Sequence, residues 1–135
     1  MKLIVHVDGG SRGNPGPAAI GVVVSAPDGE IVDRANATIG VASNNVAEYK
    51  ALLLGVERVK EAGATEIEIV NDSELIQKQI NGQYKVKHPD MKPLHKQSLA
   101  ALAAFDKWQV RSVPRAQNKQ ADELVNQALD GEAVG

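Results

Sequence analysis

The segment KLIVHVDGGSRGNPGPAAIGVVVS, at residues 2–25, decides the fold class. Its first part, Leu3 to Asp8, would form a strand with apolar side chains on both faces that ends at a polar position. The next part, SRGNPGP at 11–17, is dense in glycine and proline, which is typical of a turn. Ala18 to Ser25 has the composition of a second strand. The segment therefore predicts two antiparallel strands joined by a turn, with an acid at the end of the first strand.

Downstream of this segment, the sequence continues the sheet and then changes its period. Pro27-Asp28-Gly29 is a tight turn that leads to a third strand near 30–39. Ser43 or Asn44 can cap a helix, whose apolar residues recur at helical spacing until Gly63 ends it. The remaining elements expected are a strand at 66–70, helices at 74–80, 93–105 and 121–129, and a strand at 108–113 in which Trp108 faces the core.

The order of these elements, βββαβααβα, includes a strand–helix–strand crossover, which is right-handed in nearly all proteins. It predicts an α/β protein with a mixed five-stranded sheet and helices on both faces. A chain of 135 residues suits one hydrophobic core, so we expect one domain at 1–130 and a flexible tail at 131–135. The tail is compatible with a native end or with the edge of a linker. This layout is shared by many proteins and does not indicate a function.

The composition, 43% apolar and 24% charged, is that of a soluble globular protein. No apolar stretch approaches the roughly 18 residues that would span a bilayer, and MKLIVHVDGG lacks the features of a signal peptide. We therefore expect a cytoplasmic monomer with no membrane partner. The absence of cysteine excludes disulfides and thiolate zinc sites. Any metal must be held by oxygen or imidazole ligands, which favours Mg²⁺ or Mn²⁺.

The net charge of −2 does not indicate a nucleic-acid-binding protein, but the charges are unevenly distributed. Residues 1–74 carry 6 Lys or Arg and 11 Asp or Glu, whereas residues 75–135 carry 9 and 6. Between Lys78 and Lys96 there are five lysines and a single acid, Asp90. Such a segment can contact phosphates, and it is also typical of a solvated loop and helix face.

Four acids from four separate elements can converge in this fold. Asp8 ends the first strand, Asp72 follows the fourth, Glu48 lies in the second turn of the long helix and Asp122 in the first turn of the last helix. Sites in open α/β sheets lie beyond the strand ends, near the point where the strand order reverses. Converging carboxylates repel one another and require positive charge, which two divalent ions about 4 Å apart would supply. Taken singly, each acid has an ordinary explanation as a turn, helix-start or surface residue.

Four motifs surround these acids, and together they resemble the type 1 ribonuclease H family. The segments are VDGGSRGNPGPAAIGVVV at 7–24, NNVAEYKALLLGV at 44–56, VNDSELI at 70–76 and VPRAQNKQADELVNQA at 113–128. Each alone is a weak signal, whereas the combination is specific and spans nearly the whole chain. The resemblance implies a ribonuclease H-like fold. It is greatest to the short form of the family, found in archaeal and actinobacterial members, which lacks a basic protrusion.

The resemblance implies that Asp8, Glu48, Asp72 and Asp122 are catalytic and bind two Mg²⁺ ions, with Mn²⁺ as an alternative metal. The implied activity is an endoribonuclease that hydrolyses the RNA strand of RNA/DNA hybrids. A metal-bound water would attack in line and leave 5′-phosphate and 3′-hydroxyl ends. Two alternatives stay open: a broader activity that includes double-stranded RNA, and a non-catalytic hybrid-binding module. A nucleotide-binding phosphatase or kinase is disfavoured because SRGNPGP lacks the Lys-Ser/Thr of a P-loop.

A hybrid-specific nuclease must detect the 2′-hydroxyls of one strand only. Glycine lets the backbone approach a minor groove closely, which suits Gly9 and Gly10. The resemblance adds contacts with 2′-hydroxyls, base edges and a phosphate of the DNA strand, although a plain turn and a helix cap also account for these residue types. The substrate-binding residues expected on this basis are Gly9, Gly10, Ser11, Asn14, Ser43, Asn44, Asn45 and Ser73.

The chain departs from many family members in the loop before the third helix. Only ten residues separate Ile80 from Met91, which leaves no room for a basic helical insertion. Hybrid binding is therefore expected to be weaker and more sensitive to salt. The residues expected to provide a reduced substitute, or else to form a solvated loop, are Tyr84, Lys85, Lys87, Lys92 and Lys96.

Two single positions also depart from the family pattern. Arg115 lies in the last loop, where many members have a mobile histidine. We expect Arg115 to contact the scissile phosphate or a departing product, or else to be an exposed loop arginine. Glu74 stands where many members carry glutamine. A carboxylate is unfavourable near phosphates, so Glu74 is left outside the expected site.

Overall fold

The structure, a computed structural model, describes residues 1–131; residues 132–135 of the expected flexible tail lie outside the described residues. The strands are β1 (Lys2–Ser11), β2 (Gly16–Ser25), β3 (Ile31–Ala42), β4 (Glu66–Asn71) and β5 (Lys107–Ser112). The helices are α1 (Asn44–Glu61), α2 (Glu74–Ile80), α3 (Lys92–Leu102) and α4 (Lys119–Leu129), with a 3₁₀ turn, η1 (Arg115–Gln117), before α4. The element order is therefore the one expected from the sequence.

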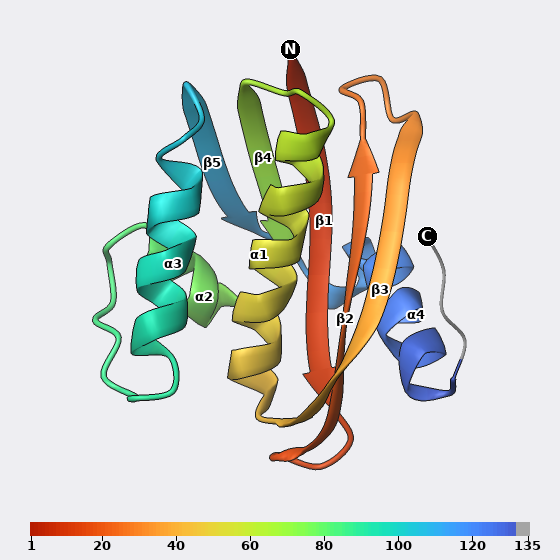
Figure 1. Ribbon diagram of the computed structural model, residues 1–135, viewed down its shortest axis with the longest axis vertical. Coiled ribbons are helices and arrows are strands. Elements are labelled where there is room, and N and C mark those ends of the chain that lie inside the picture. The colour runs from red at the N-terminus through yellow and green to blue at the C-terminus, as the bar shows by residue number, and fades with distance from the viewer. Residues whose placement is uncertain (132–135) are drawn as a thin grey trace.

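The five strands form one mixed sheet in the order β3-β2-β1-β4-β5. The first three strands form an antiparallel meander, and β4 and β5 add in parallel beside β1. Helices α1, α2 and α3 cover one face of the sheet, and α4 packs on the other face against β1, β2 and β3 (Figure 1). These observations confirm the predicted α/β architecture with helices on both faces.

The core lies between the sheet and α1. Val5 and Val7 of β1 and Leu52 of α1 are fully buried there, and each such side chain stabilises the fold by about 1.5–3 kcal/mol. Helix α1 lies close to β1 at Gly55, which has no side chain to hold them apart. A Cβ atom at Gly55 would lie only 2.8 Å from the Val7 side chain. A Cβ atom at Gly9 would overlap the backbone carbonyl of Ala47. This close approach brings the second turn of α1 onto the last residues of β1.

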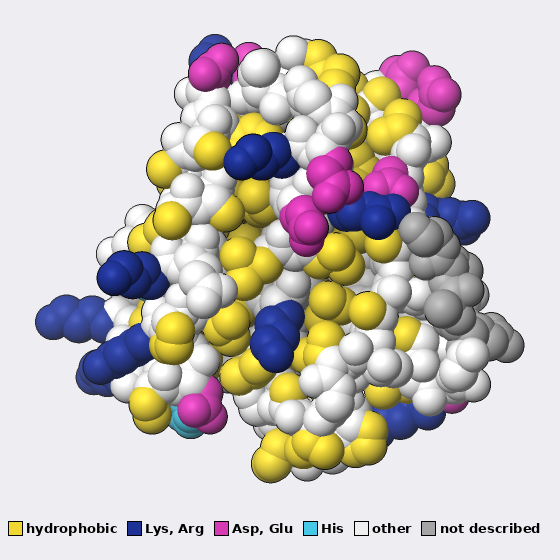
Figure 2. Space-filling model, viewed as in Figure 1, with side chains coloured by type: hydrophobic (Ala, Val, Ile, Leu, Met, Phe, Trp, Pro, Cys, Tyr) yellow, Lys and Arg dark blue, Asp and Glu magenta, His cyan; other side chains and the backbone are white. Residues whose placement is uncertain are grey.

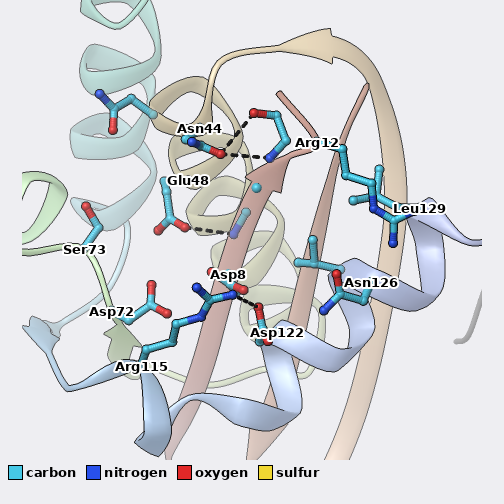
Figure 3. A pocket seen from close by; sticks show the side chains of 15 residues that line it. Asp8, Arg12, Asn44, Glu48, Asp72, Ser73, Arg115, Asp122, Asn126 and Leu129 are labelled. Carbon is cyan, nitrogen blue, oxygen red and sulfur yellow. Dashed lines mark hydrogen bonds and ion pairs between the residues drawn. The ribbon is translucent and has the colours of Figure 1, made fainter. Parts of the chain in front are cut away.

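Strand β1 is longer than expected. Its pairing with β2 continues through Gly9 and Gly10 to Ser11, whereas its pairing with β4 ends at His6 and Val70. Asp8 is therefore not the end of the strand, as the sequence suggested, but lies where β1 has lost its parallel neighbour. The carboxylate faces the opening that β4 leaves there (Figure 3).

Two further expectations need correction. Helix α3 ends at Leu102 rather than at residue 105. Trp108 was expected in the core, and this is wrong: its side chain is 37% exposed. The physical reason is that β5 is an edge strand that pairs only with β4, so Val110 alone of its residues is buried. Separately, no helix in the described part of the chain is long and apolar enough to cross a membrane.

Candidate active site

Three carboxylates converge where β1 and β4 separate. Asp8, Glu48 and Asp72 each offer an oxygen atom, and these atoms all lie within 4.8 Å of one another. Asp8 and Glu48 are each only 7% exposed. The parallel pairing of β1 with β4 ends at His6 and Val70, and Asp8 and Asp72 each follow two residues later, so they lie side by side. Glu48 reaches the same place from α1 (Figure 3). The structure thus brings together three of the four acids expected to form the site.

Glu48 is held by the backbone of β1. The Gly9 N–H donates to Glu48 Oε1 at 3.0 Å, and helix α1 is started by Ser43, whose hydroxyl accepts from the Val46 N–H at 3.2 Å. The second carboxylate oxygen, Glu48 Oε2, is buried and has no hydrogen-bond partner among the described residues. A buried acceptor without a partner is costly, and a cation in the cluster would satisfy it.

Asp72 is fixed by the residues on either side of it. The Asn71 side chain accepts a hydrogen bond from the Ser73 N–H at 3.1 Å, and the Asn71 carbonyl accepts from the Val113 N–H at 2.8 Å. The Ser73 hydroxyl caps α2 by accepting from the Ile76 N–H at 3.3 Å. Asp72 therefore sits in a short link between β4 and α2 that hydrogen bonds of Asn71 and Ser73 hold on both sides.

Asp122, the fourth acid, lies at the rim of the cluster. Its Oδ1 is 3.3 Å from Arg115 Nη2, and Arg115 is 77% exposed (Figure 3). Its helix is tied to β1 by Asn118, whose side-chain amide donates to the Val7 carbonyl at 2.9 Å. Asn118 was not expected in the site. Its only signal in the sequence is the N-x-x-AD motif, which does not reveal a partner 111 residues away.

The cluster is electrostatically strained without a cation. Burial, with the neighbouring Asp72 charge, raises the pKa of Asp8 to about 7. Burial and the charge of Asp8 raise the pKa of Glu48 well above its ordinary value. Burial also raises the pKa of Asp72, although the Arg115 guanidinium acts in the opposite direction. An oxygen-only set of converging acids with an unsatisfied buried oxygen fits hard divalent cations such as Mg²⁺ or Mn²⁺.

The acids lie at one end of an open cavity of about 530 Å³. Most of the expected substrate-binding residues line it. The expected residues that line the cavity are Asp8, Gly9, Gly10, Ser11, Asn44, Asn45, Glu48, Asp72, Ser73, Arg115 and Asp122. Four lining residues were not expected there, namely Arg12, Val125, Asn126 and Leu129. Val125 and Leu129 are four residues apart on α4, so the sequence identifies them as part of an apolar helix face. It does not show that this face borders a cavity.

Asn14 and Ser43 do not line the cavity, but both hydrogen-bond to the backbone at the start of α1. Asn44 Oδ1 accepts from the Ser11 N–H at 2.9 Å and from its hydroxyl at 3.0 Å. The Asn14 side chain accepts from the Asn44 N–H at 3.1 Å. The turn after β1 is thus bonded to the start of α1. Ser43 borders a separate hollow that also includes Lys50 and His88.

The lysine-rich loop is not part of this cavity. Tyr84, Lys85 and Lys87 lie exposed in the connection between α2 and α3, with the Lys78 ammonium donating to the Tyr84 hydroxyl at 3.4 Å. Basic side chains project from this side of the molecule, at the left of Figure 2. The structure therefore places these residues at a second surface, away from the acids.

A mixed sheet of this order, with acids where its central parallel strands separate, defines the ribonuclease H-like class of proteins. Residues 6–128 match the sequence model of a family described as reverse transcriptase-like. The crystal structure of RNase H1 from the archaeon Halobacterium salinarum superimposes with a TM-score of 0.95 at 43% identity, covering 97% of this chain and 99% of that one. The structure of LC11-RNase H1 in complex with an RNA/DNA hybrid gives a TM-score of 0.91 at 40% identity, covering 96% and 97%.

Similarity to a longer protein adds to this comparison. A bifunctional protein of Mycobacterium tuberculosis is 44% identical over 134 residues, which are 98% of this chain. The chain spans 37% of the length of that relative, and 65% of the length of ribonuclease HI of Halobacterium salinarum. The chain belongs to the type 1 ribonuclease H family.

Proposed function

We propose that this protein is a ribonuclease H, a metal-dependent endonuclease that hydrolyses the RNA strand of RNA/DNA hybrids. The observation that carries the proposal is the trio of Asp8, Glu48 and Asp72, whose oxygens lie within 4.8 Å in an open cavity. The relatives named ribonuclease H, one of them with a bound hybrid, support the same activity.

Asp8, Glu48, Asp72 and Asp122 would hold two divalent ions, Mg²⁺ or Mn²⁺. When bound, such ions activate water and neutralise the charge that develops on a phosphodiester during in-line hydrolysis, here leaving 5′-phosphate and 3′-hydroxyl ends. The contribution of the protein is to hold the carboxylates in place. The Gly9 N–H fixes Glu48, and Asn118 joins the helix of Asp122 to the strand of Asp8.

Arg115 would act at the rim of the cavity. It is exposed, it lies beside Asp122, and it presents a planar group that suits a phosphate. It would contact the scissile phosphate or the departing product. An arginine stays charged near neutral pH, so Arg115 does not serve as a general base.

Recognition of the RNA strand would rest on the turn after Asp8 and the start of α1. Gly9 and Gly10 both line the cavity, and Gly10 has no side chain to hold a ribose away. Ser11, Asn44 and Ser73 offer groups that can donate to or accept from 2′-hydroxyls. Asn45 lines the same wall. Asn14 and Ser43 would hold a phosphate of the DNA strand, and the surface of Tyr84, Lys85 and Lys87 would contact the DNA strand further away.

A cleavage assay with labelled RNA/DNA hybrid, double-stranded RNA and double-stranded DNA tests this proposal. We expect the hybrid to be cut with Mg²⁺ or Mn²⁺ and to survive in EDTA, and we expect the double-stranded DNA to survive throughout. A hybrid that survives both with Mg²⁺ and with Mn²⁺ contradicts the enzymatic proposal. If the protein nevertheless binds that intact hybrid, it is a non-catalytic binding module. Cleavage of double-stranded RNA alongside the hybrid would identify the broader activity.

A further inference from the structure

The cavity continues past the acids toward the C-terminal end of α4, where its lining changes. The four acids lie at one end, and the other end is formed by Arg12, Asn126 and Leu129 (Figure 3). Val125 also lines the cavity, beside Gly10. Gly10 lies between the two ends on β1, and a Cβ atom there would meet nothing nearer than 3.9 Å. The floor of the cavity at this position is therefore open backbone, which lets an elongated ligand pass from one end to the other.

Arg12 is the available cation of this cavity. Among the residues described as lining it, Arg12 and Arg115 are the basic ones, and Arg115 lies against Asp122. Arg12 is anchored at its backbone, where its N–H donates to the Pro17 carbonyl at 2.8 Å, while its side chain is half exposed. The guanidinium lies 2.8 Å from the carboxylate of Asp130, at the end of α4. The pair holds the guanidinium at the cavity wall. Because the pair is exposed, replacing Asp130 by another anion costs little free energy.

The spacing suits the strand whose cleavage is proposed. Arg12 directly follows β1 and lies four positions after Asp8, a span of about 13 Å in extended chain. A nucleic-acid strand carries one negative charge per roughly 3.4 Å of helix axis, so a strand with a phosphate at the acids presents another within reach of Arg12. Leu129, which is partly exposed, offers an apolar surface beside it, and the exposed Asn126 amide offers a donor. Val125 lines the cavity but is only 4% exposed.

We propose that Arg12 binds a phosphate of the RNA strand a few nucleotides from the cleaved bond, with Asn126 beside it and a ribose against Leu129. The inference rests on the proposed function. It adds a contact with the RNA strand, separate from the DNA-strand phosphate that Asn14 and Ser43 would hold. In binding, the guanidinium exchanges its carboxylate partner, Asp130, for the phosphate.

Three variants test the contact by steady-state cleavage of the hybrid at several salt concentrations. Arg12→Ala is expected to raise KM roughly five- to tenfold with kcat unchanged, and to reduce the slope of log(kcat/KM) against log[salt] by about 0.9. Arg34→Ala removes an exposed arginine on β3, outside the cavity, and is the matched control. Asp130→Asn breaks the same ion pair but keeps the cation, so its KM should equal or fall below the wild-type value.

An Arg12→Ala variant that behaves like Arg34→Ala overturns the inference. So does an Asp130→Asn variant with the same rise in KM as Arg12→Ala, because the ion pair would then serve only the fold. If the wild-type protein does not cut the hybrid at all, the proposed function has failed instead. If the wild-type protein cuts and Arg12→Ala has no specific effect, only this inference has failed.

Substrates with one neutral methylphosphonate linkage locate the contact. In the wild-type protein, one linkage in the RNA strand away from the cleaved bond should raise KM by the same factor as Arg12→Ala. The same linkage should have no further effect in the Arg12→Ala variant. If the rise in KM that is lost in Arg12→Ala appears only for linkages in the DNA strand, the assignment to the RNA strand is wrong.

Discussion

Gly9 serves two purposes at once in the centre of this site. Its N–H holds Glu48, and its missing side chain lets α1 lie against β1 at Ala47. A Cβ atom there would overlap the backbone of the helix rather than a movable side chain, so the helix itself would have to move. The spacing between helix and strand therefore depends on this one residue.

The substitution Gly9→Ala should lower the free energy of unfolding by about 1–3 kcal/mol, because it overpacks a rigid contact. It should also lower the cleavage rate by displacing Glu48. Urea unfolding followed by circular dichroism measures the first effect. Gly10→Ala is the matched control, since its Cβ atom meets nothing nearer than 3.9 Å, and its stability should stay within about 0.5 kcal/mol of wild type. Equal urea midpoints for all three proteins would contradict this account of Gly9.

Single residues also show what the sequence could and could not predict. That Asp8, Glu48 and Asp72 lie together could be predicted, because each stands within a specific motif. Asn118 and Arg12 could not, because their importance comes from partners far along the chain: Val7 for Asn118, and the end of α4 for Arg12. Residue type and local spacing carry no information about such contacts.

At the scale of elements, β3 is joined to α1 by one well-formed ion pair. Arg58 donates to both carboxylate oxygens of Asp33, at 2.7 and 2.9 Å. Hydrogen bonds from Arg58 hold the pKa of Asp33 below its ordinary value of 3.8. The pair connects the edge of the sheet to the helix that carries Glu48.

Asp33→Asn should lower the free energy of unfolding by about 0.5–1 kcal/mol at pH 7, as expected for a partly exposed pair. Because the pKa of Asp33 is lower in the folded state, this stabilisation is fully present above pH 3.8 and is lost as the pH falls through the lowered value. Urea titrations of both proteins between pH 2 and pH 7 measure the difference, with Asp106→Asn as the control. A difference that persists unchanged at pH 2 would contradict the assignment to this pair.

The order and type of the elements could be predicted because the period of the apolar residues changes clearly between strands and helices. The extent of β1 could not be predicted, because two consecutive glycines are typical of a turn. Only the pairing of Gly9 and Gly10 with β2 shows that the strand continues through them. The exposure of Trp108 could not be predicted either. It depends on β5 being at the edge of the sheet, which is a property of the strand order.

At the scale of the whole molecule, the acidic cluster opposes folding when no cation is bound. The pKa of Asp8 is raised to about 7 in the folded state, from 3.8. The cost is therefore fully present above pH 7, declines as the pH falls, and is absent below pH 3.8. A divalent cation binds the folded cluster and should offset this cost.

Thermal unfolding in EDTA and in Mg²⁺ measures this effect. The metal-free protein should gain stability between pH 8 and pH 5, and Mg²⁺ should raise the Tm at pH 8. Asp8→Asn should be more stable than the wild-type protein in EDTA at pH 8 and should respond weakly to Mg²⁺. A wild-type Tm that does not change with Mg²⁺ would argue against a metal site at these residues.

The distribution of charge over the molecule explains why its composition is a poor guide to its partner. A net charge of −2 includes acids that a metal would neutralise, whereas Arg12 at the far end of the cavity and Lys85 and Lys87 in the exposed loop carry positive charge apart from those acids. The substrate was therefore indicated by the motifs and not by the overall charge.

Single-turnover cleavage of an RNA/DNA hybrid by wild-type protein and by Asp72→Asn, over a range of Mg²⁺ concentrations, tests whether the carboxylates form a metal-dependent active site. The variant keeps the size of the side chain and one acceptor oxygen but removes one charge from the trio. We predict that the wild-type protein cuts the RNA strand only with the metal, and that the variant binds the hybrid yet cuts it at least about 100-fold more slowly. A variant that retains the full rate, or a wild-type protein that cuts equally well in EDTA, would contradict a metal-dependent site built on these carboxylates.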